Sequence, residues 1–328
     1  MDHFRGAIAT KILNNIPPYV KPIDYLMESL NISRESVYRR IRGDISFALE
    51  EVAKLSVELG FSTDELIMKD MPSRVFFDLH HTNVQNPSDI FVASFQQYTQ
   101  GVFDMPRTKD IELTMIVNHI PYEFIIFFNQ LFKFSYYRWM HQNQESSLKY
   151  FYSDVVLPDK LIYLQQKTSE NLKTIQNNTF IFDSNIFLNL IHEIQYYYKR
   201  KLIKEEDFML LKEDLLRLVD MVESVAQTGT CGSSYAHYNF YLSSLNINSS
   251  SRYIKYDEQI KSQFFVNLMT PMTITNSTLC DLHKKWLDSA KKYSTLITQS
   301  NEILQVRYFD KQRVHVNNIA IIPNGYSL

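Results

Sequence analysis

Apolar residues recur every three or four positions through most of this chain, which is the spacing of amphipathic helices. In the first 70 residues the pattern comes in short stretches that end at proline, asparagine or glycine. The sequence predicts five helices in this part, at 2–15, 22–30, 33–42, 46–59 and 62–67.

Local signals place the ends of these helices. Asn31 can adopt the left-handed conformation that closes the second helix, and Ser33 is a suitable N-cap for the third. The third helix would bury Val37 and Ile41, which lie one turn apart, and end at glycine. Ser46 is expected to cap the fourth helix, whose buried stripe would be Leu49, Val52, Ala53, Ser56 and Leu59.

Longer periodic segments, rich in aromatic side chains, follow from residue 85 onward. Seven further helices are expected there, at 89–103, 122–142, 158–175, 184–201, 204–227, 275–297 and 300–317. The stretches 237–247, 251–257 and 262–270 combine aromatic and branched residues with partial alternation, which favours a three-stranded antiparallel meander. The segment 110–117 also fits a short strand.

These elements give the expected fold class, which is mainly α. We expect a five-helix domain at 1–70, a linker at 71–84, and a larger helical domain at 85–328 with a small antiparallel β-meander. The composition agrees with this view, because only 7 of the 328 residues are glycine and 45% are hydrophobic.

Charge and cysteine content exclude several classes of protein. The formal net charge is −2, so any contact with nucleic acid must come from a local basic patch. Only two cysteines are present, which excludes a disulfide framework and a cysteine-based zinc site. The longest apolar run, 124–128, is too short to span a bilayer, and the first residues lack the apolar core of a signal peptide. We therefore expect a soluble cytoplasmic protein with no membrane partner.

The basic patch is the segment SRESVYRRIRG, Ser33–Gly43. It holds four arginines and one glutamate, a local charge of +3, whereas residues 1–72 as a whole carry nine basic and eleven acidic side chains. Burial of Val37 and Ile41 would turn one set of side chains outward near the start of the helix. That set is Arg34, Glu35, Ser36 and Arg39.

This set has the chemistry of base recognition. An arginine fork can bond guanine O6 and N7 together, and Glu35 could accept from a cytosine amino group. Other groups nearby would hold the DNA backbone, which adds affinity but no sequence preference. The expected phosphate contacts are Lys21, Ser33, Tyr38, Arg40 and Arg42.

Residues 30–67, LNISRESVYRRIRGDISFALEEVAKLSVELGFSTDELI, resemble the lambda-repressor-like (Cro/XRE-type) helix-turn-helix domain, and the likeness covers roughly residues 1–70. Its most specific part is a Ser-capped reading helix ending in glycine, then a Leu-Glu-rich helix ending in Leu-Gly, then Ser-x-Asp-Glu-Leu. The resemblance implies that Arg34, Glu35, Ser36 and Arg39 contact bases in the major groove.

The sequence also departs from that family at four positions. Ile23 stands where the family has a phosphate-contacting glutamine, Met27 where it has a small alanine, and Asn31 where it has glycine. Ile41, the last buried residue of the reading helix, lies one position later than in the family. These departures leave a second interpretation open, in which the domain serves protein contacts and does not bind DNA.

The leading expectation is a sequence-specific DNA-binding transcription regulator of the XRE type. Its partners would be double-stranded DNA and a second copy of the chain, since dimers of this kind bind half-sites about 34–36 Å apart or a multiple of that. The domain 85–328 would dimerise and could also bind an unknown effector. The alternative is a protein-interaction scaffold with a helix-turn-helix fold. No nucleotide-binding or metalloprotease motif occurs, so we expect no enzyme, no cofactor and no metal site.

Other residues are only weak candidates for a metal site or a nucleophile. They are the pairs His80–His81, His192–Glu193 and His283–Asp281, and Cys231 in the segment GTCGSS. Ordinary surface or core histidines and a loop cysteine explain them better than a metal site or a nucleophile does. The aromatic clusters at 127–139 and 196–198 are typical of a core or a dimer seam, with the wall of a ligand pocket as the open alternative.

Overall fold

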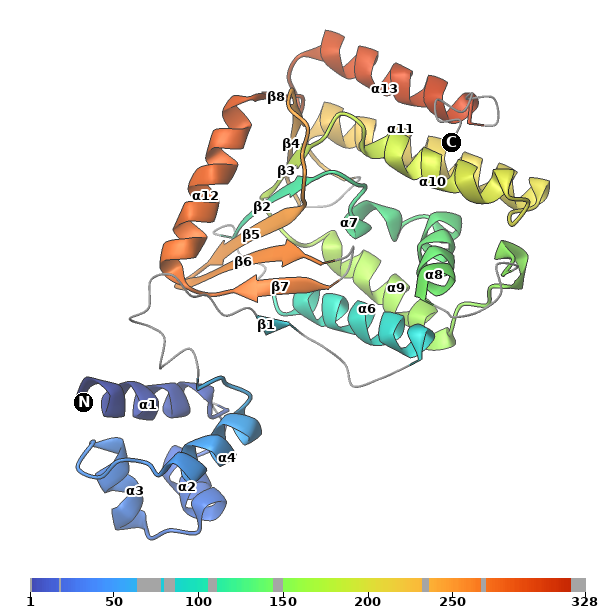
Figure 1. The fold of residues 1–328 in the computed structure, drawn as a ribbon. Coiled ribbons are helices and arrows are strands. Elements are labelled where there is room, and N and C mark those ends of the chain that lie inside the picture. Colours follow the sequence, from blue (N-terminus) through green and yellow to red (C-terminus); the bar gives the residue numbers. More distant parts are fainter. Residues whose placement is uncertain are drawn as a thin grey trace. The chain divides into compact units, whose positions relative to one another are not determined.

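The computed structural model describes residues 2–17, 19–63, 78–79, 86–105, 111–143, 150–231, 236–266 and 270–319. The chain divides into two compact units, Met1–Phe76 and Phe77–Leu328, here called unit 1 and unit 2 (Figure 1). The predicted fifth helix beyond residue 63 and the His80–His81 pair lie outside the described residues.

The described part of unit 1 forms four short helices around a small apolar core. The helices are α1 (Asp2–Asn15), α2 (Pro22–Leu30), α3 (Arg34–Ile41) and α4 (Leu49–Leu59). Each helix contributes to the core, as the apolar spacing predicts. Its buried side chains are Ile12, Ile16, Leu26, Val37, Leu55 and Phe61.

The start of α4 differs from the prediction. The helix begins at Leu49 with Ala48 as N-cap, and not with Ser46 as the cap. The Glu51 carboxylate accepts the Ala48 N–H at 2.9 Å, so one of the free N–H groups at this helix end has an acceptor without a serine. Leu49 is in the first turn and is 79% exposed, so its predicted burial is wrong.

Unit 2 contains an eight-stranded mixed sheet, so the prediction of a mainly helical fold with only a small meander is wrong. The strand order is β1-β7-β6-β5-β2-β3-β4-β8. The strands are β1 (Asp78–Leu79), β2 (Glu112–Val117), β3 (Asn178–Phe182), β4 (Tyr238–Ser243), β5 (Ser251–Tyr256), β6 (Gln259–Phe265), β7 (Pro271–Ile274) and β8 (Ser294–Leu296). Strands β2, β3 and β4 are parallel neighbours, and the other pairs are antiparallel.

The short strand expected at 110–117 is confirmed as β2, whereas its parallel neighbour β3 was missed, and burial on both faces explains why. Along β2, Met115 and Val117 face the main core while Ile116 faces the opposite side. The same holds on β3, where Phe180 faces the main core and Ile181 the opposite side. A strand buried on both faces gives a continuous apolar run without alternation, and such a run does not reveal its period.

The predicted meander is correct for only part of its length. Strands β5 and β6 pair antiparallel, and β7 continues the series. Strand β4, however, pairs with β3 and β8 instead of β5. The predicted helix 275–297 is also shorter than expected, because its last residues form β8.

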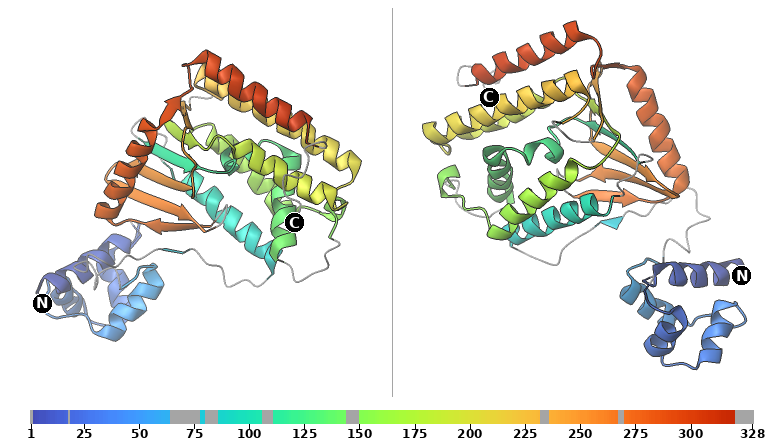
Figure 2. Two further views of the ribbon diagram at one scale, coloured as in Figure 1. Left: turned by 45° about the horizontal axis from the view of Figure 1, so that its top comes forward. Right: turned by 180° about the vertical axis from the view of Figure 1, so that it is seen from behind.

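Helices cover the two faces of this sheet unequally. Among the described helices, α12 (Ser277–Lys292) lies on one face, and the others lie on the opposite face (Figures 1 and 2). Those others are α6 (Pro87–Phe103), α7 (Tyr122–Ile125), α8 (Asn129–Asn143), α9 (Asp159–Leu172), α10 (Ile186–Lys199), α11 (Glu205–Thr228) and α13 (Glu302–Asn317); a short 3-10 helix, η1 (Tyr152–Asp154), follows α8 in the chain. None of the helices in the described part of the chain is long and apolar enough to cross a membrane.

A buried tertiary contact divides one predicted helix. The segment 122–142 forms α7 and then α8, with a break between them. The buried carboxylate of Asp214, on α11, accepts the Gln130 N–H at 2.8 Å. Asp214, which is distant in the sequence, therefore supplies an acceptor at the start of α8. The spacing of apolar residues within 122–142 could not predict this contact.

Aromatic rings fill the core between the sheet and the larger helical layer. Phe240 on β4 is fully buried, and its ring centroid lies 4.9 Å from that of Phe182, 5.8 Å from that of Phe124 and 5.9 Å from that of Phe180. The cluster predicted at 127–139 is largely core, since α8 buries Phe132, Phe134 and most of its neighbours, whereas in the cluster 196–198 only Tyr197 is buried.

Candidate functional site

The turn between α2 and α3 has the geometry that the sequence predicts. Asn31 is left-handed, at φ 52° and ψ 47°, and its N–H bonds to the Met27 carbonyl. Ser33 is extended, and its hydroxyl accepts the Ser36 N–H at 3.3 Å. Three residues thus end one helix and cap the next, so α3 starts at Arg34.

The exposed face of α3 carries most of the predicted base-contacting set. Val37 is buried in the core of unit 1, which turns Arg34, Glu35 and Arg39 toward solvent. Neither Arg34 nor Arg39 has a hydrogen-bond or ion-pair partner for its guanidinium among the described residues. Ser36 is only half-buried, and its hydroxyl accepts from Ser33 at 3.1 Å.

The predicted phosphate contacts fall into two groups. Lys21, Ser33, Tyr38 and Arg42 are exposed, Tyr38 to 44%, and Arg42 makes only a solvent-exposed ion pair with an aspartate at 3.4 Å. Arg40 differs from them, because its guanidinium is engaged inside unit 1.

Arg40 joins α3 to α4 through two parallel hydrogen bonds. Its Nε and Nη2 donate to the two carboxylate oxygens of Glu51 at 2.9 and 2.8 Å, and the side chains are only 15% and 18% exposed. Since Glu51 also accepts the Ala48 N–H, one carboxylate caps α4 and fixes α3 against it. Arg40 therefore holds α3 in place, and its guanidinium is not free for the predicted phosphate contact.

Electrostatics agree with that arrangement. Burial opposes the ionisation of Glu51, but hydrogen bonds from Arg40 and from the Ala48 N–H outweigh it and lower the pKa of the carboxyl group. Glu51 is therefore charged at neutral pH and can hold the guanidinium.

Replacing Glu51 with alanine should lower the free energy of unfolding of unit 1 by about 1–3 kcal/mol, because Arg40 and the Ala48 N–H both lose their acceptor. Hydrogen exchange of peptides spanning 34–59 in the full-length protein measures this. Glu50→Ala is the matched control, since Glu50 is an exposed neighbour with no partner in the described part of the chain. Equal acceleration of exchange in both variants would contradict the role of Glu51.

The Arg40–Glu51 ion pair should make the stability of unit 1 depend on pH. Because folding lowers the pKa of Glu51, its carboxylate stabilises unit 1 above the ordinary carboxyl pKa. That stabilisation is lost as the pH falls through the lowered pKa. The difference in exchange between the wild type and Glu51→Gln should therefore shrink in acid.

The weaker candidates have structural explanations. Both ring nitrogens of His283 lie 2.9 Å from serine hydroxyls, and burial lowers its pKa to about 4, so it is a neutral core histidine. Glu193 pairs with Arg138 and not with its neighbour His192. Burial raises the pKa of the Cys231 thiol, the opposite of what a nucleophile needs. Among the described residues, no group of three or more His, Cys, Asp or Glu side chains could hold a metal ion.

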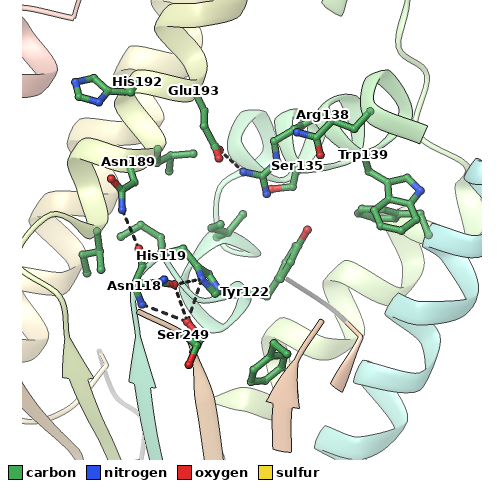
Figure 3. Close-up of a pocket in the computed structure, with 18 of the residues that line it drawn as sticks. Asn118, His119, Tyr122, Ser135, Arg138, Trp139, Asn189, His192, Glu193 and Ser249 are labelled. Carbon is green, nitrogen blue, oxygen red and sulfur yellow. Dashed lines mark hydrogen bonds and ion pairs between the residues drawn. The ribbon is translucent and has the colours of Figure 1, made fainter. Parts of the chain in front are cut away.

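A second site, which the sequence did not reveal, is a cavity of about 850 Å³ in unit 2 (Figure 3). Its walls come from α6, α8 and α10, from the residues that follow β2, and from the residues that precede β5. The lining residues are spread from Phe91 to Phe265, so no local motif could have revealed the cavity. The sequence signal closest to it is the aromatic cluster at 127–139, for which the wall of a ligand pocket is one of the two interpretations given above.

Comparison of the chain with protein-family models, with curated proteins and with solved structures finds no match. The functional assignment therefore rests on the residues and geometry described above.

Proposed function

We propose that this protein is a sequence-specific DNA-binding transcription regulator, in which α3 enters the major groove. The observation that carries the proposal is a pair of exposed arginines, Arg34 and Arg39, on a serine-capped helix after a three-residue turn, neither of which has a side-chain partner among the described residues. Unpaired guanidinium groups on a rigid helix suit bidentate contacts to guanine. The Arg40–Glu51 ion pair supports the proposal, because base reading needs a fixed helix.

The start of α3 suits a DNA phosphate. The first N–H groups of a helix lack partners within the helix and attract anions. Ser33 satisfies the Ser36 N–H, and the N–H groups of Arg34 and Glu35 have no acceptor in the described part of the chain, so they are available to an external one. Exposed Lys21 and Arg42 add positive charge in the same unit.

The proposal includes a homodimer and a cytoplasmic location. One reading helix contacts only a few base pairs, so two copies on neighbouring half-sites are needed for useful specificity. We assign dimerisation to unit 2 and expect a pseudo-palindromic site with half-sites about 34–36 Å apart or a multiple of that.

Selection of binding sites from random duplex DNA with the full-length protein tests this function. A recovered pseudo-palindromic motif is expected, and affinity for it should fall steeply with salt because phosphate contacts release counterions. Failure to enrich any motif would remove DNA reading from the proposal. A strictly monomeric chain at micromolar concentration, with and without DNA, would remove the dimer.

The second candidate function is a protein-interaction scaffold. The observation that favours it is an apolar stripe on the outer face of α4, where Leu49 is 79% and Val57 83% exposed, with exposed Ala53 between them. Exposed apolar side chains one turn apart are typical of helices that bind a partner. The selection experiment separates the two candidates, because a scaffold yields no DNA motif.

A further inference from the structure

The cavity in unit 2 lies where ligands commonly bind in sheets with parallel strands. Asn118 and His119 directly follow β2, and α10 follows its parallel neighbour β3, so the cavity opens beyond the carboxyl ends of these strands. Its volume of about 850 Å³ is within the range of small-molecule sites.

Asn118 fixes the geometry of one wall. Its carbonyl accepts from Asn189 of α10 at 2.9 Å, and its side-chain amide donates to the Asn248 carbonyl at 3.3 Å. Its Oδ1 accepts from the Ser250 hydroxyl at 2.9 Å. One residue therefore ties together three segments that are far apart in the sequence, and the wall is formed before any ligand arrives (Figure 3).

The charged groups in the walls cancel. Arg138 of α8 is 13% exposed and pairs with Glu193 of α10. Burial, helped by the nearby Arg138, lowers the pKa of His119 to about 4, so this imidazole is neutral at neutral pH. The His192 ring points away from the other labelled side chains in Figure 3. A ligand with a net charge would have to break the pair or remain uncompensated.

Aromatic rings and unpartnered polar groups complete the walls. Trp139 is held by its indole N–H, which donates to the Pro87 carbonyl at 2.8 Å, and its ring centroid lies 6.1 Å from that of Phe91. His119 Nε2 and the side-chain amides of Gln142 and Asn248 have no hydrogen-bond partner among the described residues. The cavity thus offers the partly exposed ring of Trp139, backed by the buried Phe91, beside several hydrogen-bonding groups.

We propose that this cavity binds a net-neutral small molecule that has an aromatic ring and hydrogen-bonding groups. Nucleosides and zwitterionic aromatic amino acids share this chemistry. Its role as the effector of a regulator rests on the proposed function, whereas the binding itself does not.

Calorimetric titration of the full-length protein tests the site with matched probes. Adenosine is paired with adenosine monophosphate, and tryptophan with N-acetyltryptophan, so each pair differs in net charge. We expect one neutral probe to bind with a Kd below about 1 mM and its charged counterpart at least about 10-fold more weakly. The neutral probe that binds shows whether the ligand is of the nucleoside class or of the aromatic amino acid class. No binding by either neutral probe, or equal binding of both members of a pair, overturns the proposal.

Two cavity variants and one control variant locate the binding. Leu190→Trp places a large ring in the cavity wall and should abolish binding, whereas Leu210→Trp, on the exposed face of α11, should leave binding unchanged. Glu193→Gln keeps the shape of the side chain and leaves Arg138 unpaired, so it should reverse the preference toward the anionic probe. Binding that is unchanged in both cavity variants overturns the assignment to this cavity, and the Glu193→Gln result decides alone if Leu190→Trp does not fold.

Measuring DNA affinity with and without the ligand separates the proposed DNA-binding function from the proposed ligand site. If the ligand binds and shifts affinity for the selected DNA site, the cavity is an effector site. If the ligand binds and DNA affinity stays constant, the effector role is overturned and the binding site stands. If no DNA motif exists at all, the proposed function fails while the titrations still decide the cavity.

Discussion

Replacing Arg39 with alanine should lower affinity for the selected DNA site about 5- to 150-fold and leave affinity for random DNA almost unchanged. The range corresponds to the roughly 1–3 kcal/mol of discrimination that a bidentate arginine–guanine contact supplies. Arg39 is exposed on α3, and its guanidinium makes no hydrogen bond or ion pair within the described part of unit 1, so its loss should not disturb the fold. Fluorescence anisotropy with labelled specific and random duplexes, at one salt concentration, measures both affinities.

Arg42→Ala is the matched control for this experiment. Arg42 follows α3, is 65% exposed and is expected to contact phosphate. Its loss should weaken binding to both duplexes equally and reduce the slope of log affinity against log salt by about 1. Arg40 is unsuited to this comparison, because it holds α3 against α4 through Glu51. Equal losses on specific and random DNA for both Arg39→Ala and Arg42→Ala would refute the assignment of the reading face.

Replacing Phe240 with alanine should lower the free energy of unfolding of unit 2 by about 3–5 kcal/mol. The ring is fully buried on β4 and packs against rings from β3 and from α7, so its removal leaves a cavity that its neighbours cannot fill. Both tryptophans of the chain, Trp139 and Trp286, belong to unit 2, so tryptophan fluorescence during urea unfolding follows this unit separately.

Phe240→Leu is the control for that measurement. It keeps an apolar side chain on β4 and removes less volume, so the loss of stability should be clearly smaller than for alanine. A loss below about 1 kcal/mol for Phe240→Ala would mean that the aromatic cluster is not closely packed.

Local chemistry made the helices of unit 1 predictable. The left-handed Asn31, the Ser33 cap and the buried Val37 are all read from neighbouring residues, and they set the exposed face of α3. The structural role of Arg40 could not be predicted from its neighbours in the sequence. It depends on Glu51, eleven positions further along, and only the packing of α3 on α4 brings the two together.

Unit 2 shows the limit of the same reasoning. Strand β3 lies between two correctly placed helices and was missed, because both of its faces are buried. The pairing of β4 with β3 is a contact between distant segments, which alternation within β4 does not encode. The cavity was hidden for the same reason, since Asn118, Asn189 and Asn248 meet only after the sheet has formed.

The strand order also determines how long each strand waits for its partners while the chain is being synthesised. Strand β2 lies in the middle of the sheet, and its partner on one side, β5, is made roughly 140 residues later. At about 5–20 residues per second, a ribosome needs about 7–28 s to travel from Val117 to Tyr256. During that interval one edge of an apolar strand lacks its partner, and a nascent chain in this state is exposed to aggregation and is a substrate for chaperones. Unit 1, whose contacts are short in range, can fold well before that point.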